Sequence, residues 1–390
     1  MSRPCPLWRA CAIALASVVV MSCPRTSTIE GRPPVPSIPS AAAIDAEAQR
    51  LMAAENVKGM ALAVIDDGRV THVAAYGQRN VARNLPLQTD TVMYGASLTK
   101  AAVAYMVLQL VDEGRIGLDT SIAAYLPKPL PEYEDYADLA GDERWRRLTP
   151  RIILNHGTGL ANFRWLEPDK KLRFHDDPGS HYGYSGEGFY ILQTVREEGL
   201  RLDLGAEMQR RVFDRFGMAN TSMQWRPDFA ANLADGYALD GSCEPHDERS
   251  GASAPGSMDT TIADQARLWA GIVRGDGLSA TSREEMMRPQ LRISRASQFP
   301  TLLTNTDASG PKIGLAAGLG VVTFDDIGGH AWFKGGHNDW TGNMLICQER
   351  GRRCVVLLAN SVRAERIYPA MVPFVLGETV MPWWWEYGSP

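Results

Sequence analysis

Ser97 and Lys100 are the residues whose types and spacing most directly suggest chemistry. A serine hydroxyl is a weak nucleophile near neutral pH and needs a nearby base. In Ser97-Leu98-Thr99-Lys100 the amine follows the hydroxyl by three residues, so a helix would place both on one face within a turn. The pair therefore predicts attack by Ser97, with Lys100 as the base and an acyl-enzyme as the intermediate.

The sequence after Ser97 predicts a buried helix. Residues 101–111 are apolar almost all round, and Gly114 follows them. The N-terminal N–H groups and the dipole of such a helix favour negative charge beside the hydroxyl. Residues 309–312 (Ser-Gly-Pro-Lys) match the same short pattern, but they lie in glycine- and proline-rich sequence. We expect no helix there and interpret that match as a coincidence.

A lysine acts as a base only after it has lost its proton. Its pKa must then fall by about 3 units, which corresponds to roughly 4 kcal/mol. Burial of Lys100 would lower its pKa, and a second cation nearby would share the effect. We therefore expect Lys100 to work in a buried setting.

Four segments carry short motifs in a fixed order along the chain. They are residues 94–100 (Tyr-Gly-Ala-Ser-Leu-Thr-Lys), 154–160 (Leu-Asn-His-Gly-Thr-Gly-Leu), 178–186, which ends in Tyr-Ser-Gly, and 334–336 (Lys-Gly-Gly). Their order and wide spacing resemble those of the serine β-lactamase and penicillin-binding protein superfamily, specifically its class C β-lactamase, DD-peptidase and esterase branch. The resemblance covers roughly residues 42 to 365. It implies a β-lactamase/transpeptidase-like fold and a serine hydrolase.

The resemblance implies a role for each matching residue. Tyr184 would share the serine proton with Lys100 and then protonate the leaving group; taken alone, it fits a core tyrosine equally well. Lys334 would set the electrostatics of that pair and meet a substrate carboxylate or carbonyl, whereas the alternative is a solvated lysine at a strand end. The N–H groups of Ser97 and His337 would form the oxyanion hole.

Three glycines belong to the predicted substrate site. Gly335 and Gly336 would let a substrate lie flat along a strand edge, although glycines there can equally mark a bulge. Gly186 departs from the family pattern, because much of the family has an asparagine whose amide binds the acylamino group of the substrate. Its absence weakens the case for penicillins and cephalosporins. We therefore rank ester hydrolysis first, D-Ala peptidase-type acyl transfer second and β-lactam hydrolysis third.

A non-catalytic cell-envelope binding protein with the same fold is the alternative from another class, and Gly186 keeps it open. His156 is expected to tie backbone together in a loop, because Gly157 and Gly159 flank it. The histidine and cysteine spacings suggest no metal, and no cofactor is expected. The formal net charge of -5 gives no basic field for nucleic acid. The expected partner is a small ester, amide or peptidoglycan-like molecule.

The pattern along the chain indicates an α+β fold. A helix is expected at 42–56, and an amphipathic stretch covers 362–376. We predict one antiparallel sheet built from the N- and C-terminal segments and flanked by helices, with a mostly helical second lobe from the middle of the chain. The domain would span 41–380, before a C-terminal tail at 381–390. The predicted strands are residues 60–65, 70–76, 319–324, 331–333, 343–347 and 354–359.

The first 40 residues suggest export. Two arginines precede an apolar run at 12–21 that is too short to span a bilayer permanently, so residues 1–22 are predicted to be a cleaved signal peptide. Cys23 follows Val-Met-Ser and resembles a lipobox cysteine, whose lipidation would tether the protein to a membrane; plain secretion is the alternative. Residues 23–40 have the composition of a linker. We expect a protein of the cell envelope or periplasm.

Two cysteines near the C-terminus frame a predicted hairpin. A turn at Arg350-Gly351 would place Cys347 and Cys354 opposite each other on adjacent strands. A cross-strand disulfide and two free buried thiols are equally consistent with this spacing. The three tryptophans at 383–385 are expected to pack against the body.

Overall fold

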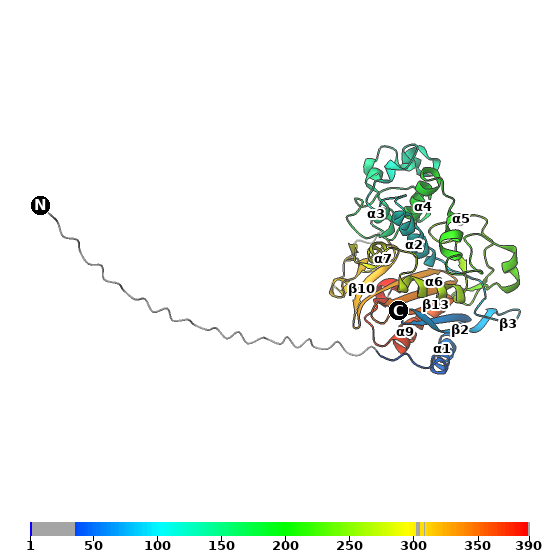
Figure 1. Cartoon of the computed structure of the whole chain (residues 1–390). Coiled ribbons are helices and arrows are strands. Elements are labelled where there is room, and N and C mark those ends of the chain that lie inside the picture. Colours follow the sequence, from blue (N-terminus) through cyan, green and yellow to red (C-terminus); the bar gives the residue numbers. More distant parts are fainter. Residues whose placement is uncertain (2–35, 302–304, 308, 389–390) are drawn as a thin grey trace. The chain divides into compact units, whose positions relative to one another are not determined.

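One antiparallel sheet forms the centre of the body in the computed structural model, which describes residues 1, 36–301, 305–307 and 309–388. Strand β1 (Gly59–Asp66) pairs with strand β13 (Arg353–Ala359), so the two ends of the chain build the sheet together (Figure 1). This arrangement confirms the predicted fold class. The strand order is β3 (Leu85–Pro86), β2 (Arg69–Asn80), β1, β13, β12 (Thr341–Gln348), β11 (Gly329–Asn338), β10 (Val322–Asp326), β9 (Ala316–Ala317) and β8 (Leu291–Arg292).

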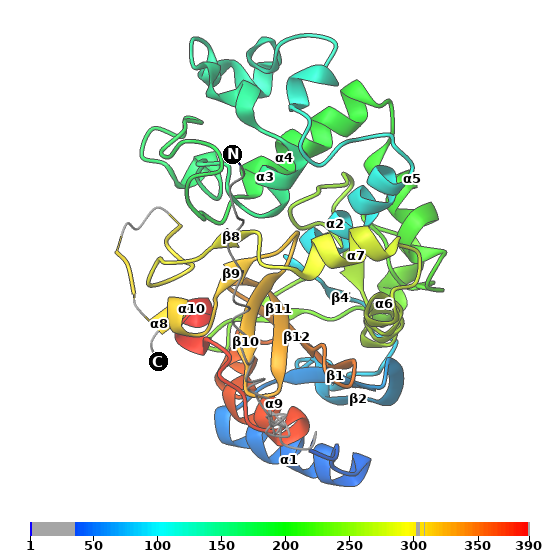
Figure 2. The ribbon, with the colours of Figure 1, turned by 60° about the vertical axis from the view of Figure 1, so that its left-hand side comes forward.

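Helices cover both faces of the sheet (Figure 2). Helices α1 (Ala41–Glu55) and α9 (Tyr368–Leu376) pack on one face, and α2 (Leu98–Asp112) and α6 (Ile262–Arg274) pack on the other. Strand β1 is buried on both faces: residues 60, 62 and 64 join the core under α1 and α9, while 61, 63 and 65 join the core under α2 and α6. Such a strand has a nearly continuous apolar sequence, as this one does.

The middle of the chain forms a lobe of short helices around α2 (Figure 1). Helix α2 is buried along almost its whole length, as its apolar sequence predicts. The other α-helices are α3 (Pro150–Leu154), α4 (Gly186–Thr194), α5 (Leu204–Met208), α7 (Ala280–Met287), α8 (Ser309–Lys312) and α10 (Trp383–Tyr387). Short 3-10 or π turns are η1 (Ile122–Ala124), η2 (Leu130–Glu132), η3 (Glu134–Leu139), η4 (Glu143–Arg147), η5 (Arg164–Leu166), η6 (Val195–Gly199), η7 (Gln209–Phe213), η8 (Pro227–Asn232) and η9 (Val362–Arg366). Two-stranded pairs join β4 (Met93–Tyr94) to β7 (Asp259–Thr260) and β5 (Gly236–Tyr237) to β6 (Cys243–Glu244).

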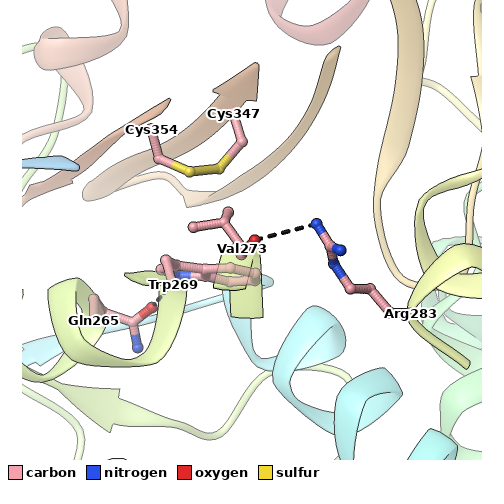
Figure 3. Close-up of a disulfide and its surroundings, with 6 residues drawn as sticks. All are labelled: Gln265, Trp269, Val273, Arg283, Cys347 and Cys354. Carbon is pink, nitrogen blue, oxygen red and sulfur yellow. Dashed lines mark hydrogen bonds between the residues drawn. A yellow bond between two sulfur atoms is a disulfide. The ribbon is translucent and has the colours of Figure 1, made fainter. Parts of the chain in front are cut away.

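A disulfide joins the two strands of the last hairpin. Cys347 of β12 stands directly opposite Cys354 of β13, and the two sulfurs are bonded. The turn has Arg350 and Gly351 at its centre, because Arg352 N donates to the carbonyl of residue 349. The bridge faces Trp269 on α6 (Figure 3). Of the two alternatives that the spacing left open, the structure has the disulfide.

Two segments differ from the sequence-based expectation or extend it. Residues 309–312 do form a single helical turn, α8, so the prediction that no helix forms there is wrong. Proline is tolerated in a first helical turn, because its missing N–H would have no partner inside the helix.

At the chain end, α10 buries Trp385, which is 1% exposed. In the described part of the chain, every helix is too short or too polar to cross a membrane.

Candidate active site

Ser97 stands where the chain turns from β4 into α2. The Nζ of Lys100 donates to Ser97 Oγ at 3.2 Å, which is the contact that the helical spacing predicts. Before the helix, Ala96 has a φ of 47°, a left-handed conformation that residues with a side chain rarely adopt. The hydroxyl of Thr99 holds this turn by donating to the carbonyl of Ala96 at 2.6 Å. Local backbone geometry thus fixes the Ser97 hydroxyl beside the amine.

Lys100 lies in a setting that favours a neutral amine. Its side chain is buried, and its Nζ also donates to the carbonyl oxygen of Pro255 at 2.7 Å. Burial lowers the pKa of Lys100 well below its usual range, and the nearby Lys334 lowers it further. Both causes were anticipated for a lysine base. The amine can therefore accept the Ser97 proton.

Tyr184 lies between the two lysines. The Nζ of Lys334 donates to Tyr184 Oη at 3.3 Å, and the Nζ atoms of Lys100 and Lys334 lie 4.8 Å and 5.0 Å from the centre of its ring. Burial raises the pKa of Tyr184, while the Ser97 hydroxyl acts in the opposite direction. The phenol is therefore protonated at neutral pH and can donate a proton. These four side chains come from three distant stretches of sequence.

His156 supports Tyr184 from behind. Its ring lies 4.3 Å from the Tyr184 ring, and its Nδ1 accepts a hydrogen bond from Ser185 N at 3.1 Å. Its backbone carbonyl accepts from Gly183 N, so it ties the loop together as expected. Burial, together with the charges of the two active-site lysines, lowers the pKa of His156 well below its usual range. The sequence did not indicate that a neutral imidazole would pack against Tyr184.

Strand β11 brings Lys334 and the two glycines to Ser97. The pairing of β10 with β11 reaches only to Phe333, so among the described strands none pairs with 334–338 on that side. A Cβ at Gly336 would lie 3.0 Å from Ser97 N, so a side chain there would crowd the start of α2. The register between β11 and β12 runs without a shift through this stretch. The glycines therefore mark a close approach, not a bulge.

Gly186 sits where the chain leaves no room for a side chain. A Cβ at this position would lie 2.3 Å from Cε1 of Phe163 and 3.0 Å from the carbonyl oxygen of Asn162. The N–H of Gly186 donates to that carbonyl oxygen and to Asn162 Oδ1. An asparagine, which the resemblance implies for much of the family, would overlap the Phe163 ring here. The ring of Phe163 occupies that space instead.

Glu386 is a neighbour of Lys334 that the sequence analysis missed. Its side chain is buried. A Cβ at Gly335 would overlap the Glu386 carboxylate, so the position of Glu386 requires a glycine at 335. Gln298 Nε2 donates to Glu386 Oε2 at 2.7 Å. Burial raises the pKa of Glu386, and the charge of Lys334 lowers it. No motif or spacing links a carboxylate near the C-terminus to a strand motif fifty residues earlier.

The cleft in front of Ser97 has a volume of about 730 Å³. It is lined by Ser97, Lys100 and Tyr184 together with apolar side chains and with His337. The Nδ1 atom of His337 lies 3.1 Å from Oε1 of Glu365. Burial opposes a charged imidazole, but the Glu365 carboxylate raises the pKa of His337.

Among the described residues, no group of three or more His, Cys, Asp or Glu side chains could hold a metal ion. Cys23, the predicted lipidation site, lies outside the described residues.

The fold and this residue set define a class of protein. A sheet built from both chain ends, a helical lobe, and one cleft with a serine, two lysines and a tyrosine are the features of the serine hydrolase superfamily to which class C β-lactamases belong. The family model described as Beta-lactamase matches residues 44–374. The chain therefore belongs to the β-lactamase family.

Curated relatives carry several activities in their names. Lovastatin esterase of Penicillium rubens is 24% identical over an alignment of 332 residues, and the match covers 72% of this chain and 82% of that protein. The D-alanyl-D-alanine-carboxypeptidase/endopeptidase AmpH of Escherichia coli is 23% identical over 70% of this chain and 72% of its own length. Monacolin J acid methylbutanoyltransferase of Aspergillus terreus is 28% identical over 202 residues, 43% of this chain. The match spans only 48% of that transferase.

Solved structures share the fold. The octameric penicillin-binding protein homologue from Pyrococcus abyssi superposes with a TM-score of 0.68 and 18% identity, over 87% of this chain and 78% of that one. The D-alanine carboxypeptidase AmpC from Burkholderia cenocepacia gives 0.66 and 20%, over 86% of this chain and 98% of that one. At these identities the likeness establishes the fold alone.

Proposed function

We propose that the protein is an exported serine esterase that works through an acyl-enzyme on Ser97. The observation that carries the proposal is the 3.2 Å contact between Ser97 Oγ and a buried Lys100 Nζ. Lys100 takes the hydroxyl proton while Oγ bonds to the ester carbonyl carbon. The tetrahedral intermediate then releases the alcohol, which takes a proton from Tyr184, and Lys100 returns a proton to Tyr184. Attack by water on the acyl carbon releases the acid and restores Ser97.

Backbone N–H groups and Lys334 complete the proposed mechanism. The N–H groups of Ser97 and His337 donate to the oxyanion of the tetrahedral intermediate. The close approach of Gly336 to the start of α2 supports this arrangement. His337 directly follows Gly336 on β11, so the strand brings His337 near Ser97 N. Lys334 donates to Tyr184 Oη and so lowers the cost of negative charge on the phenol.

The site favours an ester over the other substrates of the family. With Phe163 in the space beside Gly186, no amide at that position can bind an acylamino group. Acyl transfer from an ester does not use such an amide, whereas recognition of penicillins would. An esterase is also among the relatives that match most of this chain. D-Ala peptide hydrolysis is the second candidate, because one relative of similar coverage carries that activity in its name. β-Lactam hydrolysis is third.

Export belongs to the same proposal. We propose that residues 1–22 are removed as a signal peptide and that Cys23 is lipidated, which holds the protein in the cell envelope through the 23–40 linker. The Cys347–Cys354 disulfide supports an oxidising compartment, because disulfides are rare in the reducing cytosol.

The first prediction tests Ser97 directly. Ser97→Ala should lower kcat for a p-nitrophenyl ester by at least about 10³-fold, because the bond-forming atom is gone. Mass spectrometry should find a fluorophosphonate attached to Ser97 in the wild type and no label on the variant. Ser309→Ala is the matched control, since Ser309 heads the other Ser-x-x-Lys segment, and it should keep full activity.

The outcomes separate the candidates. Labelling of Ser97 by the fluorophosphonate alone indicates an esterase, and labelling by penicillin as well indicates the penicillin-interactive activities. Labelling by neither reagent would support the non-catalytic binding protein. Hydrolysis by Ser97→Ala at the native rate would refute the proposed function.

A further inference from the structure

Several apolar side chains line the cleft. Phe163 and Leu166 line it, and the ring of Phe163 is stacked on Trp165 with 4.2 Å between ring centres and 8° between planes. Leu166, which lines the cleft, is 65% exposed, whereas Trp165 does not line it. Phe299 also lines the cleft, where its ring lies 5.3 Å from that of Tyr184. Large exposed apolar side chains at the mouth of a pocket are typical of a site that binds an apolar group.

Phe163 borders the space in which we place the acyl group. The family resemblance implies that position 186 faces the acyl part of the substrate. Here the Phe163 ring fills the space beside Gly186, 2.3 Å from where a Cβ would be. An acyl group bonded to Ser97 would therefore meet this aromatic ring, next to the amide of Asn162. Contact between a hydrocarbon chain and this ring removes apolar surface from water.

Acidic side chains also line the cleft. Asp240, Asp339 and Glu365 line it. Asp240 and Asp339 are exposed, and neither forms an ion pair among the described residues. Glu365 is held by His337, which offsets its charge. Arg363 donates to the carbonyl of Leu239 and lies close enough to act on Asp240.

Among the described residues, the basic groups at the cleft already have partners: His337 contacts Glu365, and both lysines are bound as well. Lys100 is buried and already bound to Ser97 and Pro255. Lys334 is buried and donates to Tyr184 and to the carbonyl of Gly335. Asp240 and Asp339, which have no ion pair within the described part of the chain, would repel a substrate carboxylate.

We infer that the substrate is an ester with an apolar acyl chain and without a carboxylate beside the scissile bond. This inference rests on the proposed esterase function and names its substrate class. It separates this site from one built for penicillins or D-Ala peptides, both of which carry a carboxylate near the bond that breaks.

The acyl arm of the test uses p-nitrophenyl acetate, butyrate and octanoate. kcat/KM should rise with chain length, and the double variant Phe163→Ser/Leu166→Ser should reduce the advantage of octanoate over acetate about tenfold, because the acyl chain loses two apolar contacts in the cleft. Ile327→Ser is the matched control, since Ile327 is 53% exposed on the turn between β10 and β11 and does not line the cleft. Equal kcat/KM values for the three esters would overturn the acyl assignment. So would a double variant that still prefers octanoate over acetate as strongly as the wild type does.

The charge arm compares phenyl butyrate with 3-carboxyphenyl butyrate, each rate divided by its rate of alkaline hydrolysis. The neutral ester should be preferred, and raising the salt concentration should narrow the gap because exposed charges are screened. Asp240→Asn/Asp339→Asn should shift the ratio toward the anionic ester by about threefold to tenfold at low salt. Glu134→Gln, an exposed acid outside the cleft, should leave the ratio unchanged.

The test distinguishes a failure of the proposed function from a failure of the inferred substrate class. A wild-type protein that hydrolyses neither phenyl ester contradicts the proposed function. A protein that hydrolyses the anionic ester as readily as the neutral one, at low salt, is an esterase for which the inferred substrate class is wrong.

Discussion

At the scale of residues, the cleft around Ser97 depends on how two buried amines share one space. Burial lowers the pKa of both, and the charge of Lys334 lowers the pKa of Lys100 further. The charge of Glu386 raises the pKa of Lys334, but burial has the larger effect and lowers that pKa to about 8. Near neutral pH, Lys334 therefore keeps its proton while Lys100 can act as the base. This difference would give each lysine its own role.

A prediction follows for Glu386. kcat/KM should fall as the pH rises through about 8, because Lys334 then loses the proton it donates to Tyr184. Glu386→Gln removes a negative charge that favours protonated Lys334, so the falling limb should move to lower pH. The pH profile of kcat/KM measures this shift, which a purely structural role would not produce. Glu378→Gln, an exposed acid on the same terminal segment, is the control. A falling limb in the same place in both variants would contradict the prediction.

At the scale of elements, close approaches decide the shape of the site. Strand β11 meets the start of α2 at Gly336, and the start of α4 meets the 160–163 loop at Gly186. In both places the neighbour occupies the position that a side chain would need. Helix α10 contributes in the same way, since it places Glu386 against Gly335. Each contact joins elements that lie far apart in the sequence.

The contact at Gly186 can be tested by a double-mutant cycle. Gly186→Ala should lower the free energy of unfolding by about 1–3 kcal/mol, because the new methyl group would overlap the Phe163 ring. In a Phe163→Ala background, the same substitution should cost much less, since the ring is gone. Thermal or denaturant unfolding of the four proteins measures the coupling. Equal costs in both backgrounds would show that Phe163 does not fill this space.

At the scale of the whole molecule, the two ends of the chain hold the domain together. Strand β1 pairs with β13, and the disulfide between β12 and β13 lies over α6. The last helix, α10, lies behind the active-site strand, so the segment first expected as a tail contributes a buried carboxylate to the site. The described body begins at residue 36, inside the predicted 23–40 linker, and its first helix begins at Ala41.

Membrane attachment should depend on Cys23. If Cys23 is lipidated, the wild-type protein will sediment with membranes and need detergent for release, whereas Cys23→Ser should be recovered in the soluble fraction. Cys243→Ser is the matched control, because Cys243 is an exposed free thiol in the body, and it should sediment like the wild type. Fractionation with immunodetection measures both. A wild-type protein found only in the soluble fraction would contradict lipidation.

Local patterns in the sequence determined a good part of this protein. The Ser97 and Lys100 pair, the buried helix after it, the hairpin at β1 and β2, and the turn between Cys347 and Cys354 all depend on residues a few positions apart, where helical and strand periods fix the geometry. The short helix at 309–312 escaped this reasoning because a proline in a first turn costs little. The order of the motifs, through the family resemblance, also brought Tyr184 and Lys334 to the predicted site.

Only the tertiary structure decided the rest. The ring of Phe163 beside Gly186, the imidazole of His156 behind Tyr184, and the carboxylate of Glu386 against Gly335 are all contacts between distant segments. Helical and strand periodicity relates only residues a few positions apart, so it cannot predict such contacts. They depend on how the sheet and the helical lobe pack together. The sequence therefore determined which groups could do the chemistry, and the fold decided which neighbours set their charge and the space left for a substrate.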